Sequence, residues 1–165
     1  MKTSPSRTSR LSLVALLVAS TLCTISARAA DGDEAAVRKA NAKFYTALNA
    51  MFTGKAEPML AIWSHADDVT YMGPGGGVLV GWKSISAAWQ KQADMKLGGK
   101  VKAVGLHVVI GDSLAVVQDT EVGKNTHVTG GKGDVSIRAT NVYRKEDGAW
   151  KMISHHTDLL PYLKP

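Results

Sequence analysis

Three side chains in the last third of the chain, Arg138, Thr140 and His155, could perform acid–base chemistry together. An imidazole titrates near neutral pH, so His155 could accept or donate a proton without much tuning. A guanidinium presents planar donors that fit a carboxylate, and a hydroxyl donates one hydrogen bond. We therefore expect Arg138 to hold the polar end of a substrate, Thr140 to donate a hydrogen bond to it, and His155 to transfer the proton.

The residues around these three side chains predict a β-hairpin. Two runs that are rich in β-branched and aromatic residues, 134–144 and 150–158, flank the turn signal Asp147-Gly148. Because side chains alternate across a strand, the arginine and the threonine share one face. We expect that face to be buried together with the histidine, where each polar group must be hydrogen-bonded or serve a ligand.

Each of these side chains also has a structural interpretation. His155 could be a core histidine bonded to a neighbour, and Arg138 could pair with a nearby acid such as Asp119. His156 should face the opposite way from His155 and is the weaker candidate. Convergence of the three side chains on an open cavity would favour catalysis, whereas a filled interior with the arginine bridged to an acid would favour a structural role.

Residues 1–29 have the pattern of an export signal. A positive start, an apolar core over residues 11–22 and a small-x-small cleavage site at residues 27–29 follow one another. We therefore expect a periplasmic or secreted protein in which residues 30–165 form one domain, with no membrane segment after cleavage. An uncleaved membrane anchor is the alternative.

The basic character of the sequence comes mostly from this expected signal. Residues 1–29 hold four of the 20 lysines and arginines and none of the 14 acids, so cleavage lowers the formal net charge from +6 to +2. That charge does not indicate a nucleic-acid partner. The one cysteine, Cys23, is removed as well, so the mature domain would have neither a disulfide nor a cysteine nucleophile.

The order of the predicted elements indicates an α+β domain. Apolar residues recur at helical spacing from Val37 to Met51, and two further helices are predicted over residues 56–63 and 83–95. Strand patterns follow, and helices before antiparallel strands argue against an alternating parallel sheet. The expected strands are residues 69–72, 78–80, 101–110, 114–122 and the two strands of the hairpin.

Two other motifs do not carry a site. Gly81 and Lys83 match part of a phosphate-binding loop, but Trp82 interrupts the Gly-Lys-Ser sequence that such a loop needs. His155 and His156 cannot bind one ion without a bulge, because neighbours on a strand point to opposite faces. The remaining histidines fall in separate elements. We therefore expect no metal and no other cofactor.

Several short motifs occur in a characteristic order between residues 33 and 160. They are Ala42-Lys43-Phe44-Tyr45 with Leu48-Asn49, Ala66-Asp67-Asp68-Val69, Gly81 with Ile85, Arg138-Ala139-Thr140, and the run Gly-Ala-Trp-Lys-Met-Ile-Ser-His-His at 148–156. Their order resembles the nuclear-transport-factor-2-like (NTF2-like) superfamily, in particular its SnoaL-like and ketosteroid-isomerase-like domains. The resemblance implies a cone-shaped, curved antiparallel sheet wrapped around three N-terminal helices, with an open, mostly apolar cavity.

The resemblance argues against the chemistry of the steroid isomerases. Their catalytic aspartate stands immediately before a proline, where this chain has Gly73 before Pro74. Their oxyanion tyrosine would fall near Phe44, with Tyr45 adjacent, and their second aspartate near Thr140. Proton abstraction beside a carbonyl needs a base and a donor for the enolate, and these expected groups are replaced.

The resemblance also argues against the chemistry of the epoxide hydrolases, which use an arginine between two aspartates. Arg138 would match the arginine, but Thr140 and His155 stand near the two carboxylate positions. The set that remains is Arg138, Thr140 and His155, which we expect at one end of the cavity. The residues expected to border the ligand are Tyr45, Trp63, Tyr71 and Trp89.

The favoured hypothesis is a domain that takes a small, partly apolar organic molecule into its cavity. If it is an enzyme, we expect cofactor-independent acid–base chemistry of the isomerase, cyclase or hydrolase type. The alternative is a non-catalytic domain that binds a ligand or assembles as a dimer. Tyr143, Trp150 and Met152, which we expect on the outer face of the sheet, predict a homodimer.

Overall fold

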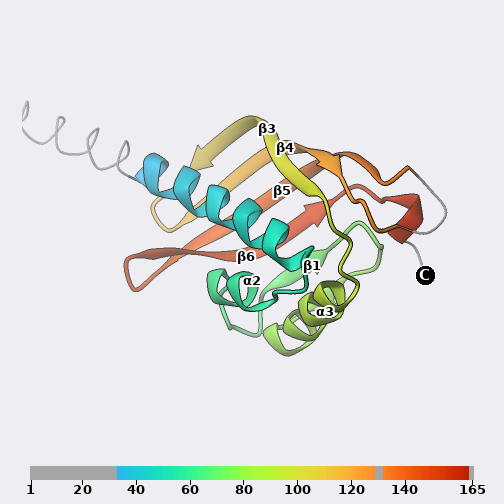
Figure 1. Ribbon diagram of the computed structural model, residues 1–165. Coiled ribbons are helices and arrows are strands. Elements are labelled where there is room, and N and C mark those ends of the chain that lie inside the picture. The colour runs from blue at the N-terminus through green and yellow to red at the C-terminus, as the bar shows by residue number, and fades with distance from the viewer. Residues whose placement is uncertain (1–32, 129–131, 164–165) are drawn as a thin grey trace, which may run out of the picture. The chain divides into compact units, whose positions relative to one another are not determined.

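The computed structural model describes residues 33–128 and 132–163 (Figure 1). The expected export signal at residues 1–29 lies outside the described residues. Residues from Ala36 onward form one compact unit. No helix in the described ranges is long and apolar enough to cross a membrane.

Three α-helices are described before β3 (Lys100–Ile110): residues 33–51, α2 (Glu57–Ile62) and α3 (Trp82–Asp94). The first of them, the long helix, turns apolar side chains spaced three or four residues apart toward the core. Pro58 stands in the first turn of α2, where a missing N–H costs no helical hydrogen bond. The most buried apolar residues of the long helix are Val37, Phe44, Ala47, Leu48 and Met51.

Six strands of the described chain form one sheet in the order β2-β1-β6-β5-β4-β3. Neighbouring strands are antiparallel except β1 and β6, which run parallel. A short 3₁₀ helix, η1 (Pro161–Leu163), follows the last strand. The strands are β1 (Thr70–Met72), β2 (Leu79–Val80), β3 (Lys100–Ile110), β4 (Leu114–Lys124), β5 (Asp134–Glu146) and β6 (Ala149–Thr157), each within two residues of its predicted bounds.

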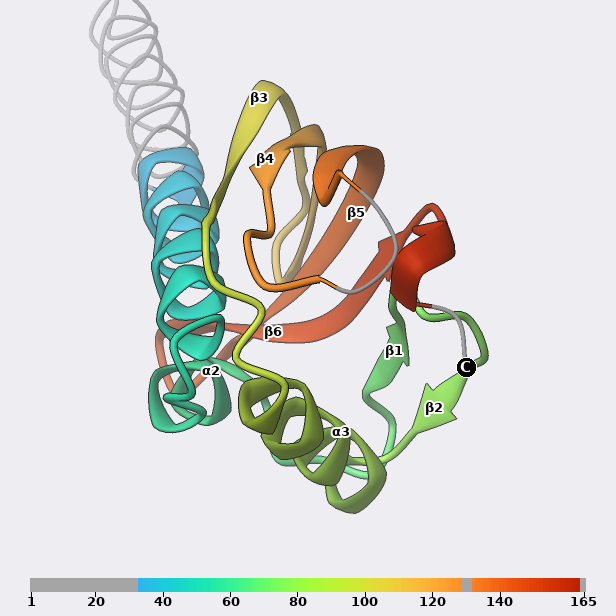
Figure 2. The same cartoon turned by 45° about the vertical axis from the view of Figure 1, so that its right-hand side comes forward.

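The sheet curves, and two irregularities in its register help it to do so. One lies in β3 between Val104 and His107, where Gly105 has a φ of 71°. The other lies in β6, where Ile153 is the extra residue opposite Val142 and Tyr143. Such bulges bend a strand and increase its twist. Figure 2 shows β3 to β6 curling over, with the long helix along one side and α3 beneath them, which confirms the predicted α+β fold with a cone-shaped sheet.

The buried face of β5 is opposite to the one that the sequence analysis chose. Because side chains alternate, Arg138 and Thr140 lie on the outer face of the sheet, away from His155. The prediction that these three side chains converge on a cavity was therefore wrong. The residues of β5 that face the core are Val135, Ile137, Ala139, Asn141 and Tyr143.

Arg138 is bound to an acid at the surface. Its Nε and Nη2 each donate a hydrogen bond of 2.9 Å to the Asp158 carboxylate, and its side chain is 84% exposed. The alternative that Arg138 pairs with an acid is thus correct, but the acid is Asp158 and not Asp119. Thr140 lies opposite His156 in the register, and His156 faces outward as predicted.

The bulge at Ile153 explains a second wrong prediction. On an unbroken strand Trp150 and Met152 would face away from His155, and the sequence analysis placed them on the outer face with Tyr143. The extra residue reverses the alternation in β6, so Trp150 and Met152 point into the core, whereas Tyr143 points there because it lies on the buried face of β5; all three are at most 9% exposed. The outer face of the sheet therefore lacks the aromatic patch on which the predicted homodimer depended.

Candidate functional site

Seven buried polar side chains meet inside the curved sheet, and we call them the inner polar cluster. They come from the long helix and from the inner face of three neighbouring strands, and none is more than 7% exposed. A buried polar group costs free energy unless it is hydrogen-bonded, so the pattern of bonds among them determines what each can do. The members are Asn41, Tyr45, Asp119, Glu121, Asn141, Tyr143 and His155.

Two amides orient the His155 ring. Asn41 Oδ1 accepts hydrogen bonds from Asn141 Nδ2 at 2.8 Å and from Tyr143 Oη at 2.9 Å. Asn141 therefore turns its oxygen toward His155, and its Oδ1 lies 2.5 Å from His155 Nδ1. Since an amide oxygen can only accept, Nδ1 carries the imidazole proton. The other ring nitrogen, Nε2, is left with a free lone pair.

The lone pair of His155 faces a carboxyl group. His155 Nε2 lies 3.9 Å from Glu121 Oε1, and both side chains are almost fully buried. Burial lowers the pKa of His155 to about 3, with the charge of His156 as a smaller cause. The imidazole is therefore neutral near pH 7 and can act only as a proton acceptor at Nε2.

Glu121 keeps its proton near neutral pH. Burial first, and the nearby charge of Asp119 second, raise the pKa of Glu121 from 4.5 to about 8, although the hydrogen bond from Tyr45 lowers it. Tyr45 Oη donates to Asp119 Oδ1 at 2.6 Å and lies 3.2 Å from Glu121 Oε1. The phenol has one proton, and the shorter of its two contacts indicates that this proton points mainly toward Asp119. Asp119 also accepts from Asn41 Nδ2 at 3.4 Å; burial raises the pKa of Asp119, and its hydrogen bonds from Tyr45 and Asn41 lower it.

Aromatic rings surround the imidazole. The ring centroids of Phe44, Tyr71 and Trp89 lie 4.7, 5.8 and 6.2 Å from that of His155, and Tyr71 is stacked nearly parallel to it. Trp63 packs on Trp89 at 5.9 Å. These rings exclude water from the site and account for the strong desolvation of His155.

The cavity that His155 and Glu121 line is small. It measures about 30 Å³, which is the space of roughly one water molecule. Tyr71 and Trp89 line it as predicted, whereas Tyr45 belongs to the inner polar cluster and Trp63 to the packing behind Trp89. The expectation of an open interior cavity was therefore wrong, because the space beside His155 is only large enough for about one water molecule.

A larger hollow adjoins this cavity. It measures about 210 Å³ and lies over the glycine-rich loop at residues 73–76. Gln92 lines both spaces and donates a hydrogen bond of 2.7 Å to Tyr71 Oη at their boundary. Leu160 N donates to Pro74 O at 2.9 Å, which holds the C-terminal segment against the loop. The residues shared by the two spaces are Tyr71, Pro74, Gln92, Leu97 and Leu163.

The family model of the SnoaL-like domain matches residues 37–160. This chain belongs to the SnoaL-like family. The predicted resemblance to NTF2-like domains is thereby confirmed. Comparison with curated proteins gives no match.

Solved structures share the fold of this SnoaL-like domain. A proposed dehydratase of the NTF2-like family from Streptomyces avermitilis is 24% identical, with a TM-score of 0.68 over 79% of this chain and 98% of that one. An NTF2-like protein with a cystatin-like fold from Novosphingobium aromaticivorans is 19% identical, with a TM-score of 0.65 over 85% and 90% of the two chains. A proposed calcium/calmodulin-dependent protein kinase II association domain from Xanthomonas campestris is 26% identical, with a TM-score of 0.60 over 75% and 87%.

The predictions from the sequence named Asp119 only as a possible partner of Arg138 and did not include Glu121. Asp119 and Glu121 have the same parity on β4 as Ala115 and Val117, which are buried. That alternation was a usable signal, because an acid in phase with an apolar face is carried into the core. In the described part of the chain, no three histidine, cysteine or acidic side chains gather as metal ligands.

Proposed function

We propose that this SnoaL-like domain binds a small, partly apolar organic molecule and moves a proton on it without a cofactor. In this proposal His155 is the base and Glu121 the acid. NTF2-like domains commonly bind small ligands. The observation that carries the proposal is the pair itself, because an unprotonated Nε2 and a protonated carboxyl lie 3.9 Å apart on the wall of one cavity. Neighbouring groups whose pKa values are pushed apart are typical of acid and base roles.

Two groups so close together reach the same face of a substrate. His155 Nε2 takes a proton from a carbon beside a carbonyl, and the electron pair left behind forms a double bond. Glu121 gives its proton to the atom that receives the displaced electrons, either the carbonyl oxygen or a leaving hydroxyl. The arrangement suits a proton shift along three atoms, or loss of water from one face of the substrate.

The charges that this step creates balance each other. His155 becomes an imidazolium while Glu121 becomes a carboxylate, so the weak base gains a counter-charge that the resting site lacks. The two groups are 3.9 Å apart, which is beyond direct hydrogen-bond reach, so the proton would return through one water. The resting protonation states are thereby restored without a cofactor.

The substrate would enter over the glycine-rich loop. The outer hollow of about 210 Å³ is below the roughly 300–1,000 Å³ typical of pockets for drug-sized ligands, which favours a small molecule. Leu163 and Pro74 line both the hollow and the inner cavity. Displacement of these two side chains would join the two spaces and admit a reactive carbon to His155.

A second candidate function is assembly without catalysis. The interior is nearly filled, Arg138 is bridged to Asp158, and three apolar side chains on β3 and β4 are exposed: Val104, Val109 and Leu114. We propose that this surface pairs two copies of the chain, since NTF2-like domains commonly form dimers. Light scattering of the mature protein at micromolar concentration tests this, and a monomer would contradict it.

Export remains a proposal that the sequence supports. We propose that the chain is cleaved after residue 29 and acts in the periplasm or outside the cell. Mass spectrometry of the protein purified from the producing cell would give the mass of residues 30–165 if cleavage occurs there. The mass of the full chain would contradict it.

Thermal-shift screening followed by proton exchange tests the catalytic proposal. Steroid-, terpene- and polyketide-like carbonyl compounds are screened for stabilisation of the mature protein, since a ligand of the native state raises its apparent stability. Each hit is then followed by proton NMR in D₂O. We expect loss of a signal beside the carbonyl with wild type and at least a hundredfold slower loss with His155→Gln and Glu121→Gln.

The matched control is Arg138→Gln, because Arg138 lies on the outer face of the same hairpin. This variant should exchange protons at the wild-type rate. Exchange that survives in His155→Gln, or that disappears in Arg138→Gln, would contradict the assignment of the base.

A further inference from the structure

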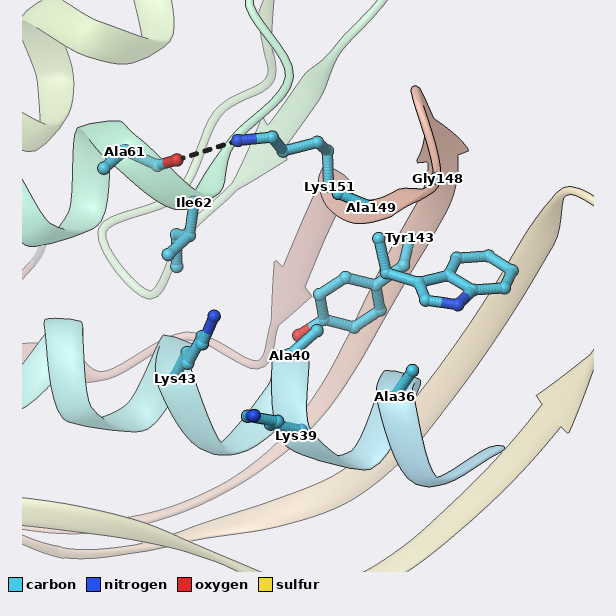
Figure 3. Close-up of a pocket in the computed structure, with 11 residues that line it drawn as sticks. Ala36, Lys39, Ala40, Lys43, Ala61, Ile62, Tyr143, Gly148, Ala149 and Lys151 are labelled. Carbon is cyan, nitrogen blue, oxygen red and sulfur yellow. Dashed lines mark hydrogen bonds between the residues drawn. The ribbon is translucent and has the colours of Figure 1, made fainter. Parts of the chain in front are cut away.

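A third space, also a hollow, lies on another part of the domain. It shares no lining residue with the cavity beside His155 or with the hollow over the glycine-rich loop. It measures about 280 Å³. Figure 3 shows it between the long helix, the C-terminal end of α2 and the turn that joins β5 to β6. We call it the basic hollow, because the charged residues that line it are Lys39, Lys43 and Lys151.

The three lysines concentrate positive charge around the hollow. Lys39 and Lys43 are four residues apart on one helix, so they lie on the same face and repel each other. Lys151 comes from β6, and its Nζ donates a hydrogen bond of 3.2 Å to Ala61 O. A carbonyl accepts that bond without cancelling the charge, so each of the three lysines that line the hollow keeps its positive charge.

Two acids near the hollow, Glu146 and Asp68, are already bound to Arg144. Glu146 accepts a hydrogen bond of 2.8 Å from Arg144 Nε, and Asp68 accepts one of 2.6 Å from Arg144 Nη1. Among the described residues, no acid lies within ion-pair distance of Lys39, Lys43 or Lys151. The hollow therefore has a positive charge that a bound anion would complement.

The floor of the basic hollow is apolar. It includes Ala40 of the long helix, Ile62 at the end of α2 and the ring of Tyr143 (Figure 3). A strongly hydrated inorganic ion gains little from such a floor, whereas a flat or branched hydrocarbon would bury apolar area on it. Ammonium groups act as point charges and place no geometric demand on the anion.

We propose that the basic hollow binds an organic carboxylate with a compact apolar body. The carboxylate lies among the three ammonium groups, and the apolar body packs on Ile62 and Tyr143. Tyr143 forms the wall toward the interior, because its ring lines the hollow while its Oη donates to Asn41 at 2.9 Å. The site is thus separate from the His155–Glu121 pair, and its existence does not depend on the proposed function.

A titration with 2-naphthoate, followed by two-dimensional amide NMR of the mature protein, tests the proposal. We expect saturable shifts confined to residues 36–43, 61–62, 143 and 148–151. The double variant Lys39→Gln with Lys43→Gln should bind at least tenfold more weakly, and added salt should weaken wild-type binding. Lys100→Gln with Lys102→Gln, which removes the same charge from the exposed face of β3, should bind as wild type does.

Two other ligands and one variant separate the possible causes. Naphthalene-2-methanol, which lacks the charge, and inorganic phosphate, which lacks the apolar body, should each bind at least tenfold more weakly than 2-naphthoate. His155→Gln should leave the affinity for 2-naphthoate unchanged. Equal binding of phosphate, shifts at Tyr71 and Gln92 instead, or unchanged affinity of the double lysine variant would each overturn the proposal.

Discussion

Replacing Glu121 with glutamine should change how the stability of the protein depends on pH. Burial, and secondarily the charge of Asp119, raises the pKa of Glu121 from 4.5 to about 8 in the folded protein. The folded state therefore holds this proton more tightly than the unfolded chain does. The resulting stabilisation is complete below pH 4.5. It is lost progressively as the pH rises from 4.5 to about 8. Glutamine has nearly the same shape as the neutral acid and cannot ionise.

His155 acts in the opposite direction. Burial, and secondarily the charge of His156, lowers its pKa from 6.5 to about 3, so its stabilisation is complete above pH 6.5 and is lost as the pH falls toward 3. Between pH 4.5 and 6.5 the two effects oppose each other. Above pH 6.5 the loss from Glu121 is unopposed by His155. One pKa unit corresponds to about 1.4 kcal/mol, so the free energy of unfolding should fall by about 2 kcal/mol from pH 6.5 to pH 8.

Urea unfolding followed by tryptophan fluorescence at these two pH values measures the effect. Wild type should lose about 2 kcal/mol, whereas Glu121→Gln should lose much less because the ionising group is gone. Glu57→Gln, a change at an exposed acid on α2, should keep the wild-type loss. A wild type that is equally stable at both pH values, or a Glu121→Gln variant that keeps the full loss, would refute the reasoning.

Three further variants test other parts of the account. Asn141→Leu removes the acceptor of His155 Nδ1 and should lower the free energy of unfolding by about 1–3 kcal/mol in urea; an unchanged value would contradict the bond. Arg138→Gln should leave the urea midpoint at the wild-type value because its pair with Asp158 is exposed, and a clear drop would show that this pair matters. Trp89→Ala should cost about 3–5 kcal/mol by the same method, since Trp89 is 1% exposed; a loss below about 1 kcal/mol would show that the ring is not packed there.

The elements of this fold were predictable because each carries a local pattern. Helical spacing from Val37 to Met51 and the turn at Asp147 and Gly148 depend on neighbours in the sequence alone. The buried face of β5 depends on which side packs against the helices, and the sequence analysis chose the side that carries Arg138. Val135, Ile137 and Ala139 make the other side more apolar, and this contrast was a usable signal.

The inner polar cluster was not predictable as a unit. Asn41 and Asn141 are 100 residues apart in the chain, and only the tertiary fold brings their amides into contact. The extra residue Ile153 leaves no trace in the period-two pattern of β6, yet it decides that Met152 and His155 share a face. His155 was expected to face inward and does, but its partners are amides and carboxyls rather than Arg138 and Thr140.

The nitrogen NMR shifts of the His155 ring test the central claim most directly. In wild-type protein between pH 5 and pH 7, the account predicts a neutral imidazole with its proton on Nδ1 and no change across that range. A ring that protonates near pH 6.5, or that carries its proton on Nε2, would contradict the assignment of His155 as the base that faces Glu121.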